Sequence, residues 1–413
     1  MPQRPIELQM MAMDQSVVRP GLLVLPIDDQ FVVFSEDKQR LISLNASAGT
    51  VLSELQKGTP VKHLAAALVS SGAATPDVAD EWVETTLKGL REQGFLVGVQ
   101  GLNFEGDTKD GEESATPPYR PINGKFVPVA EHYYELLGTR AKIRFEHEAQ
   151  VRLVNSVIGH LATKETSGVT LNIDVQAVPL NNGHLLSNTF VNGTAFSHAP
   201  RLSKLGPIVK AALWQSAVKA HDHFLYIHAG VVASGDRCII LPAAAGSGKS
   251  SLTAALVHAG YRYYSDEAVL LERDSFLVPP MALAICCKAS GWELMTHYFP
   301  SIMDLPVHLR EDGKYVRYVP PPPGSSKQPS LPVSHIVFPR YSELAKTNVE
   351  RLSPAAALSR LMGECLATGQ RLSNKNVAAL VRWIEAIACY DLTFSSLDQA
   401  VERIRGIESQ KSH

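Results

Sequence analysis

The sequence predicts an α/β (α+β) protein in which a small domain precedes a larger one. Three observations lead to this prediction. A segment rich in Gly, Asp, Glu and Pro at 100–121 has little periodicity and is typical of a linker. Short apolar runs and three helical patterns lie before it, whereas an apolar strand, a glycine loop and an Ala/Leu-rich helix follow it. We therefore expect one domain at 15–99 and a second at 122–408.

Composition excludes several classes of protein. The 413 residues carry 39 Lys and Arg against 41 Asp and Glu, a net charge of −2, so no overall basic field attracts nucleic acid or an anionic membrane. No apolar stretch reaches the roughly 20 residues that span a bilayer, and the first residues lack the apolar core of a signal peptide. Five cysteines without a C-x-x-C pair favour reduced thiols. We expect a cytoplasmic protein without nucleic-acid or membrane partners, and leave homo-oligomer formation open.

The small domain begins with strands. Apolar runs at 22–25, 31–34 and 41–44 are separated by turn residues, which predicts a small antiparallel sheet. A further apolar run at 95–97 follows Gly94 and predicts a closing strand. With the helices between them, these strands suggest a winged-helix-like domain.

Three helices are expected between these strands. Asn45 precedes the first helix as a capping residue, and Thr59 and Thr75 each place a capping hydroxyl before a proline at the first helical position. In the third helix apolar residues recur at helical spacing. These are Val78, Trp82, Val83, Leu87 and Leu90.

Several positions of the small domain form a recognisable set: Leu44-Asn45-Ala46, Gly58, Val61, Leu64, Leu68, Leu90 and Gly94-Phe95-Leu96. Through them, residues 19–97 resemble the PqqD-like family of small peptide-recognition domains. The resemblance implies that this domain binds a peptide or small protein, by adding a strand to an exposed sheet edge. Residues 45–97 contain four basic and six acidic side chains, so the net charge of this segment is negative, which disfavours DNA binding. A purely structural appendage is the alternative.

The segment most informative about chemistry starts at an apolar strand, 238–241. A loop and an Ala/Leu-rich helix follow it, the context of a phosphate-binding loop, although Ala243 replaces the usual first glycine. Gly246 and Gly248 let backbone N–H groups turn inward, and the helix directs its positive end at the phosphates. Lys249 can bridge the β- and γ-phosphates of ATP, and the Ser250 hydroxyl can hold Mg²⁺. The predicted nucleotide-binding residues are Ala243, Ala244, Ala245, Gly246, Ser247, Gly248, Lys249, Ser250 and Ser251.

Two neighbouring features could complete the site. Asp266 and Glu267 follow Lys249 by 17 and 18 residues, and one such carboxylate can bind Mg²⁺ while another accepts a proton from an attacking hydroxyl. His228 opens an apolar strand 21 residues before Lys249. From the residues alone, the histidine can equally be structural and the acid pair a solvated turn.

The same segment resembles the HPr kinase/phosphorylase superfamily, whose fold is related to phosphoenolpyruvate carboxykinase. The residues that carry the resemblance are His228-Ala229-Gly230, Gly246-Ser247-Gly248-Lys249-Ser250, Ala259-Gly260-Tyr261-Arg262 and Ser265-Asp266-Glu267. The closest similarity is to the shorter HPr-kinase-related proteins. The Gly-rich, Arg-containing segment that accompanies HPr docking and phosphorylase activity is not found, which argues against HPr as the substrate.

The resemblance implies specific roles. Lys249 and Ser250 would bind nucleotide and Mg²⁺, Asp266 would be the general base, Glu267 a metal-binding or orienting acid, and His228 the partner of Asp266. Lys288 is expected to reach a phosphate, whereas Arg317 and Arg340 stay open between a phosphate contact and a surface charge.

Together these observations predict an ATP-dependent kinase that phosphorylates a serine, or another hydroxyl, of a peptide or protein held by the N-terminal domain. One alternative is a kinase of a folded regulatory protein or a small molecule. Another is a non-catalytic protein in which nucleotide occupancy switches partner binding.

Overall fold

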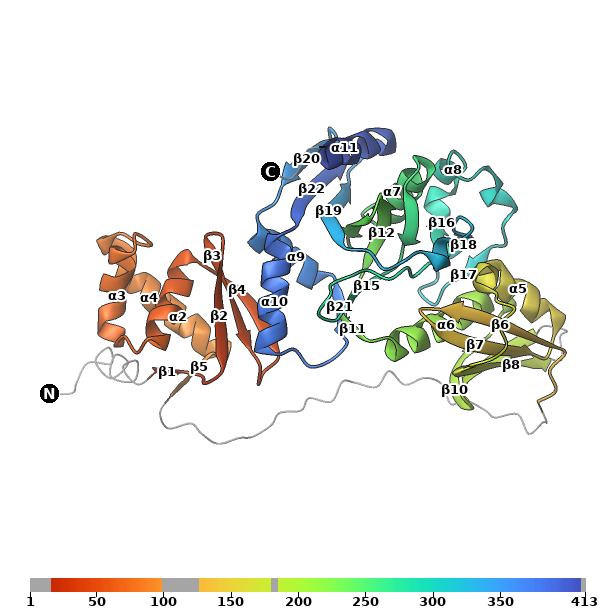
Figure 1. Cartoon of the computed structure of the whole chain (residues 1–413), viewed down its shortest axis with the longest axis horizontal. Coiled ribbons are helices and arrows are strands. Elements are labelled where there is room, and N and C mark those ends of the chain that lie inside the picture. The colour runs from red at the N-terminus through yellow and green to blue at the C-terminus, as the bar shows by residue number, and fades with distance from the viewer. Residues whose placement is uncertain (1–15, 99–125, 180–184, 410–413) are drawn as a thin grey trace. The chain divides into compact units, whose positions relative to one another are not determined.

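The computed structural model describes residues 16–98, 126–179 and 185–409, so the predicted linker at 100–121 lies outside the described residues. The described chain forms two compact units in a mixed α/β architecture (Figure 1). The first unit contains 16–98 together with 353–360 and 371–386. The second unit contains the rest. Two late segments of the chain therefore belong to the N-terminal unit, which no pattern in the sequence indicated.

The sheet of the first unit agrees with the sequence. Strands β2 (Leu22–Ile27), β3 (Gln30–Ser35) and β4 (Arg40–Asn45) pair antiparallel in that order, and β1 (Ser16–Val18) pairs with β5 (Leu96–Gly98). The antiparallel sheet and the closing strand are thus confirmed. The description of this unit as a winged helix stays a prediction.

Helices α2 (Ala46–Gln56), α3 (Val61–Ser70) and α4 (Pro76–Glu92) follow the sheet. Asn45 caps α2 by accepting a hydrogen bond from the Ala48 N–H at 2.9 Å, as predicted. The predicted position of Thr75 directly before α4, with Pro76 as the first helical residue, is confirmed, but neither threonine hydroxyl caps its helix. Thr59 lies outside α3 and donates its hydroxyl to Glu54 at 2.8 Å, and Thr75 precedes α4 without a side-chain cap. Trp82, predicted on the apolar face of α4, is 41% exposed because its side of the helix has no partner among the unit's core residues.

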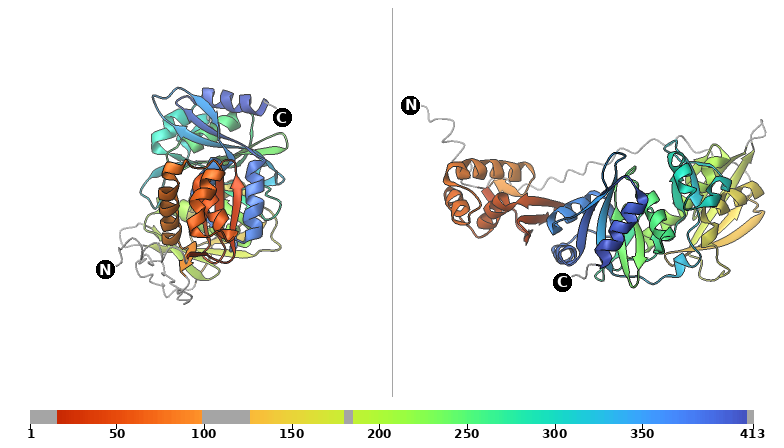
Figure 2. Two further views of the ribbon diagram at one scale, coloured as in Figure 1. Left: turned by 90° about the vertical axis from the view of Figure 1, so that its left-hand side faces the viewer. Right: turned by 90° about the horizontal axis from the view of Figure 1, so that it is seen from above.

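The second face of the β2–β4 sheet is covered by helices from the far end of the chain. Val33 belongs to the core shared with α2–α4, so its neighbours Val32 and Phe34 point to the opposite face, where they are 3% and 0% exposed. Helix α10 (Asn374–Glu385) packs on β2 (Figure 2), and its residue Leu380 is buried. Helix α9 (Pro354–Gly363) precedes it. The sheet is therefore the middle layer of a three-layer unit.

Polar contacts join these helices to the sheet. Asp28 accepts a hydrogen bond from the Ala355 N–H in the first turn of α9, and Glu36 accepts one from the N–H of Asn374 at the start of α10. Gln39 exchanges two hydrogen bonds with the backbone of Leu372. A carboxylate at a helix N-terminus satisfies an otherwise free N–H and complements the helix dipole. Both late helices thus begin on acidic side chains of the early sheet.

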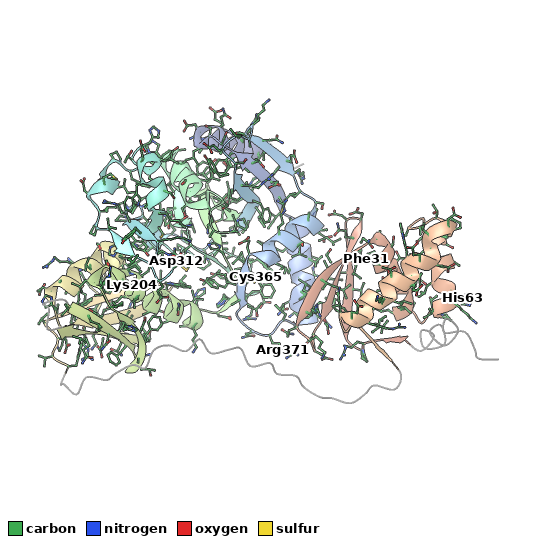
Figure 3. All side chains as sticks on the ribbon, turned by 180° about the vertical axis from the view of Figure 1, so that it is seen from behind. Phe31, His63, Lys204, Asp312, Cys365 and Arg371 are labelled. Atoms are coloured by element: carbon green, nitrogen blue, oxygen red, sulfur yellow. The ribbon has the colours of Figure 1, made fainter. Side chains whose placement is uncertain are left out.

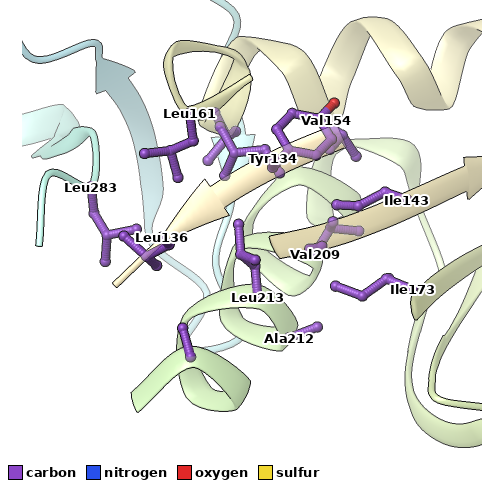
Figure 4. Packing of buried hydrophobic residues seen from close by; sticks show 14 of the residues in the cluster. Tyr134, Leu136, Ile143, Val154, Leu161, Ile173, Val209, Ala212, Leu213 and Leu283 are labelled. Carbon is purple, nitrogen blue, oxygen red and sulfur yellow. The ribbon is translucent and has the colours of Figure 1, made fainter. Parts of the chain in front are cut away.

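One half of the second unit is a five-stranded sheet covered by two helices. In sheet order the strands are β10 (Thr194–Ala199), β9 (Leu185–Val191), β8 (Leu171–Pro179), β7 (Thr139–Phe145) and β6 (Ala130–Leu136). Helices α5 (Glu148–Ile158) and α6 (Leu205–Ala220) pack on it. Figure 4 shows Ile143, Val154 and Leu213 meeting in its core.

The other half is built on a six-stranded sheet. In sheet order its strands are β14 (Arg262–Ser265), β12 (Ala229–Ser234), β13 (Arg237–Pro242), β19 (Val333–Tyr341), β22 (Ala388–Phe394) and β20 (Asn348–Arg351). Helix α7 (Lys249–His258) packs on β12 and against α11 (Leu397–Ser409). Residues 320–332, which are rich in proline, form a loop that contains the short helix η5 (Ser325–Lys327).

Two smaller sheets complete the second unit. One has the order β15 (Val269–Glu272), β11 (His223–Ile227) and β21 (Cys365–Thr368), and the other β16 (Ile285–Lys288), β18 (Tyr315–Val319) and β17 (His308–Leu309). The short helices are η1 (Gly159–Leu161), η2 (Leu202–Lys204), η3 (Ala289–Gly291), α8 (Trp292–Met295) and η4 (Pro300–Asp304). Within the described ranges, no helix combines the length and apolar character that crossing a membrane requires.

Candidate active site

The glycine loop lies where the sequence placed it, between β13 and α7. Gly246 and Gly248 have φ of 96° and 85°, the left-handed region in which a side chain is strained. Ala244, Ala245 and Gly246 are exposed. The Ser247 carbonyl accepts a hydrogen bond from the Tyr341 N–H at 2.9 Å, which ties the loop to β19. The loop is therefore anchored at one end and open along its middle.

Lys249 is the first residue of α7 and is 6% exposed. Its Nζ lies 2.7 Å from Nε2 of His228, which joins β11 to β12. Burial lowers the pKa of Lys249. Burial, and then the charge of Lys249, lower the pKa of His228 to about 4. The imidazole is therefore neutral near pH 7, and Nε2 accepts the hydrogen bond that the ammonium donates.

Asp266 is 4% exposed and lies beside the start of α7. Burial raises the pKa of its carboxyl to about 6, although the charge of Lys249 and a hydrogen bond from the Ser250 hydroxyl act in the opposite direction. The Oδ1 atom is buried without a hydrogen-bond partner. The Ser250 hydroxyl is an oxygen donor that suits Mg²⁺ held with nucleotide phosphates, and Oδ1 of Asp266 stays available to accept a proton.

Glu267 turns away from this pair and meets Lys210 of α6, a lysine that is only 3% exposed. Although burial raises the pKa of Glu267, the charge of Lys210 and its hydrogen bond outweigh that effect and lower it. Sequence reasoning missed Lys210. The signal was present, because Lys210 is a single charge inside the otherwise apolar start of α6.

His228 has a second partner that the sequence did not indicate. Strand β21 pairs with β11, so Glu364, just before Cys365 (labelled in Figure 3), lies beside His228. The Glu364 carbonyl accepts the His228 N–H at 2.8 Å, and its Oε2 lies 3.6 Å from the imidazole Nδ1. Among the hydrogen bonds of the described residues, none joins His228 to Asp266. The structure thus brings His228 to Lys249 and Glu364.

Of the other cations that the sequence offered for phosphate contacts, Lys288 lies near the site and Arg317 packs elsewhere. Lys288, at the end of β16, lowers the pKa of both Lys249 and His228 by its charge, so it lies within electrostatic reach of the site. Arg317 stacks over the Trp292 ring at 4.6 Å and donates to the Ile302 carbonyl at 3.1 Å, which is a packing role.

Arg340 is exposed and donates to the Thr393 hydroxyl at 2.9 Å. Within the part of the chain that the structure describes, no three His, Cys, Asp or Glu residues group as a metal cluster. A Mg²⁺ held with nucleotide phosphates does not need such a cluster, because phosphates and water supply most of its ligands.

One family model matches part of the smaller domain. The family model described as "Coenzyme PQQ synthesis protein D (PqqD)" matches residues 30–96. No curated protein matches the chain.

Two solved structures are similar to parts of the chain. One is described as TbiB1 in complex with the TbiA(beta) leader peptide. It is 17% identical, covers 20% of this chain and 95% of its own, and has a TM-score of 0.19. The other is the Hpr(Ser) kinase/phosphatase from Coxiella burnetii. It is 11% identical, covers 45% of this chain and 98% of its own, and has a TM-score of 0.21.

Proposed function

We propose that the second unit is an ATP-dependent phosphotransferase acting on a serine or other hydroxyl. The observation that carries the proposal is the grouping of Lys249, Ser250 and Asp266 at the end of an open glycine loop. A buried ammonium, a hydroxyl and a buried carboxylate with a free oxygen are the groups that phosphoryl transfer requires. A structural lysine would more simply be paired with a carboxylate, whereas Lys249 donates to a neutral imidazole.

Each group has a role in this proposal. The exposed backbone of 244–246 and the Lys249 ammonium bind the nucleotide phosphates, and the Ser250 hydroxyl holds Mg²⁺. The metal, when bound, neutralises charge on the phosphates. Oδ1 of Asp266 accepts the proton of the acceptor hydroxyl. Because its carboxylate is engaged by Lys210, Glu267 is assigned the orienting role and not the metal-binding one.

Two measurements on the full chain test this proposal. The first is titration with a fluorescent ATP analogue and Mg²⁺, in which Lys249→Ala is expected to abolish saturable binding. The exposed lysine variant Lys164→Ala is the matched control and should bind as the wild type does. The second is incubation with γ-labelled ATP and a pooled set of serine peptides. Binding without transfer to any peptide would favour the non-catalytic switch.

We further propose that the first unit captures the peptide substrate at the edge of β4. The PqqD match includes β3 and β4 of this sheet, and the two outer strands β2 and β4 differ in how open they are. On β2 the Leu22 carbonyl already accepts a hydrogen bond from the Gln56 side chain at 3.1 Å, and α10 packs beside it. A peptide strand that pairs with β4 therefore does not have to displace contacts such as those at the edge of β2. Capture raises the effective concentration of the acceptor at the transfer site.

Hydrogen exchange on the full chain tests this edge. On adding a peptide that serves as substrate, the amides of β4 should become protected while those of β2 change little. Equal protection of both strands, or none, would argue against the β4 edge. Deletion of residues 1–100 is a poor substitute for this experiment. It would also expose the apolar side of α10, which the sheet covers, and so confuse lost capture with lost structure.

A further inference from the structure

Glu364 contacts His228 through its backbone and its side chain, and the two contacts can be separated. The backbone contact, His228 N–H to the Glu364 carbonyl at 2.8 Å, extends the pairing of β21 with β11. Any side chain at position 364 preserves it. The carboxylate makes the other contact, with Oε2 3.6 Å from Nδ1. This is longer than a hydrogen bond, and catalytic hydrogen bonds in empty sites are often long.

The two imidazole nitrogens of His228 face opposite partners. Nε2 faces the Lys249 ammonium, which has three donors and no acceptor, so Nε2 must be the unprotonated nitrogen. A neutral imidazole then carries its proton on Nδ1, the atom that faces the Glu364 carboxylate. A carboxylate there stabilises that tautomer, because it accepts from an Nδ1–H and is repelled by a bare nitrogen.

We propose that Glu364 is a positioning residue that fixes the tautomer of His228 and thereby pre-organises Lys249 for the nucleotide phosphates. The inference rests on the proposed nucleotide site. One N–H of the ammonium is held by Nε2, and two remain for phosphate oxygens. In the other tautomer an Nε2–H would face the ammonium, and the two donors would push Lys249 away from the mouth of the loop.

The surroundings of the pair support this assignment. Burial raises the pKa of Glu364, and the charge of Lys249 opposes that effect. The carboxylate is therefore close enough to interact with the Lys249 charge, although His228 is the residue that bonds the ammonium. A carboxylate that bonded Lys249 directly would compete with phosphate for the ammonium. Because the imidazole lies between them, Lys249 has a neutral partner, so no ion pair has to be broken when the ammonium binds phosphate.

A double-mutant cycle on nucleotide affinity tests the inference in the full chain. Glu364→Ala should weaken binding of the fluorescent ATP analogue about fivefold to tenfold, the loss expected from one hydrogen bond. Glu364→Gln should lose about twofold or less, because the amide oxygen can still accept from Nδ1–H. In a variant that already carries His228→Ala, Glu364→Ala should weaken binding of the ATP analogue by less than a further factor of about two. Unchanged or tighter binding in Glu364→Ala, or its full effect without His228, would overturn the proposal.

A second readout is independent of nucleotide and of phosphoryl transfer. Nitrogen NMR of labelled histidine side chains distinguishes the two tautomers, and the signal of His228 is identified by its loss in His228→Gln. The wild type should carry the proton on Nδ1, and Glu364→Ala should give a mixture. A proton on Nε2 in the wild type would refute the inference even if the chain is a kinase. Correct tautomers without nucleotide binding would instead refute the proposed function. Glu402→Ala, an exposed glutamate variant on α11, is the control for both measurements.

Discussion

Gly230 and Thr253 approach so closely that a Cβ built on the glycine would lie 2.5 Å from the threonine hydroxyl oxygen. The same Cβ would lie 3.4 Å from Cγ of Lys249. A residue without a side chain at this point of β12 lets α7 rest directly on the strand that follows His228. This contact is one reason that Lys249 and His228 meet at 2.7 Å.

Gly230→Ala should therefore damage the site and the fold together. The added methyl must displace Thr253 or α7, at a cost of about 1–3 kcal/mol in the free energy of unfolding. Nucleotide affinity should fall with it, because Lys249 starts α7. Gly406→Ala in α11 is the matched control, since a Cβ there meets no atom within 4 Å. Denaturant unfolding and nucleotide titration measure both effects, and equal stability of the two variants would contradict this account.

The local pattern of the site was predictable, and its partners were not. A strand, two glycines with positive φ and a Lys-Ser start to a helix are encoded in adjacent residues, so the loop before Lys249 was correctly placed. Lys210 and Glu364 come from α6 and from the turn before β21, far away in the chain. Their contacts with Glu267 and His228 depend on how sheets pack, which the spacing of residues does not encode.

In the first unit, too, the sequence predicted local elements but not the contacts between distant parts of the chain. Its strands and helices follow local periodicity, and its sheet was predicted. The three-layer arrangement was not, because α10, which packs on β2, lies more than three hundred positions later in the chain. The predicted cap at Thr59 is wrong because α3 begins two residues later, at Val61, and the Thr59 hydroxyl donates to Glu54.

Asp266→Asn should separate nucleotide binding from transfer. The amide keeps the size of the carboxyl and can still accept a bond from Ser250, but it does not accept a proton. The rate of transfer to a peptide should fall by about a hundredfold or more, while the affinity for the ATP analogue changes little. Single-turnover transfer with γ-labelled ATP measures the effect. Transfer at the wild-type rate, with Lys249→Ala inactive, would exclude Asp266 as the base.

The ion pair of Lys210 and Glu267 should respond asymmetrically to mutation. The Lys210 side chain is 4% exposed and that of Glu267 is 33% exposed. Glu267→Gln leaves a buried ammonium without its countercharge, at an expected cost of about 3–5 kcal/mol in the free energy of unfolding. Lys210→Met leaves a carboxylate that water can reach and should cost less. Denaturant unfolding compares the two, and a more damaging Lys210→Met would contradict this interpretation of the burial.

Two histidines, the half-buried His160 and the buried His308, should make the protein less stable in mild acid. Burial lowers the pKa values of His160 and His308 to about 4, and in His160 the hydrogen bond to the Ala282 carbonyl only partly opposes that shift. Because the ordinary value is about 6.5, the unfolded state binds more protons between these limits. Stability is complete above about pH 6.5 and is lost as the pH falls toward 4. Urea midpoints across this range should drop less steeply in His160→Gln, whereas the exposed variant His63→Gln should retain the wild-type slope.

The late helix and the early sheet should unfold together. Leu380 of α10 is 0% exposed, and truncation to Ala removes buried contacts worth about 2–4 kcal/mol. Because α10 covers one face of the sheet, hydrogen exchange in Leu380→Ala should accelerate in β2, β3 and β4 as well as in α10. The five-stranded sheet of the second unit should exchange as before. Leu344→Ala, at a leucine that is 97% exposed, is the neutral control. Faster exchange confined to α10 would mean that the sheet is stable without its second cover, and deletion of residues 1–100 would then become an interpretable test of peptide capture.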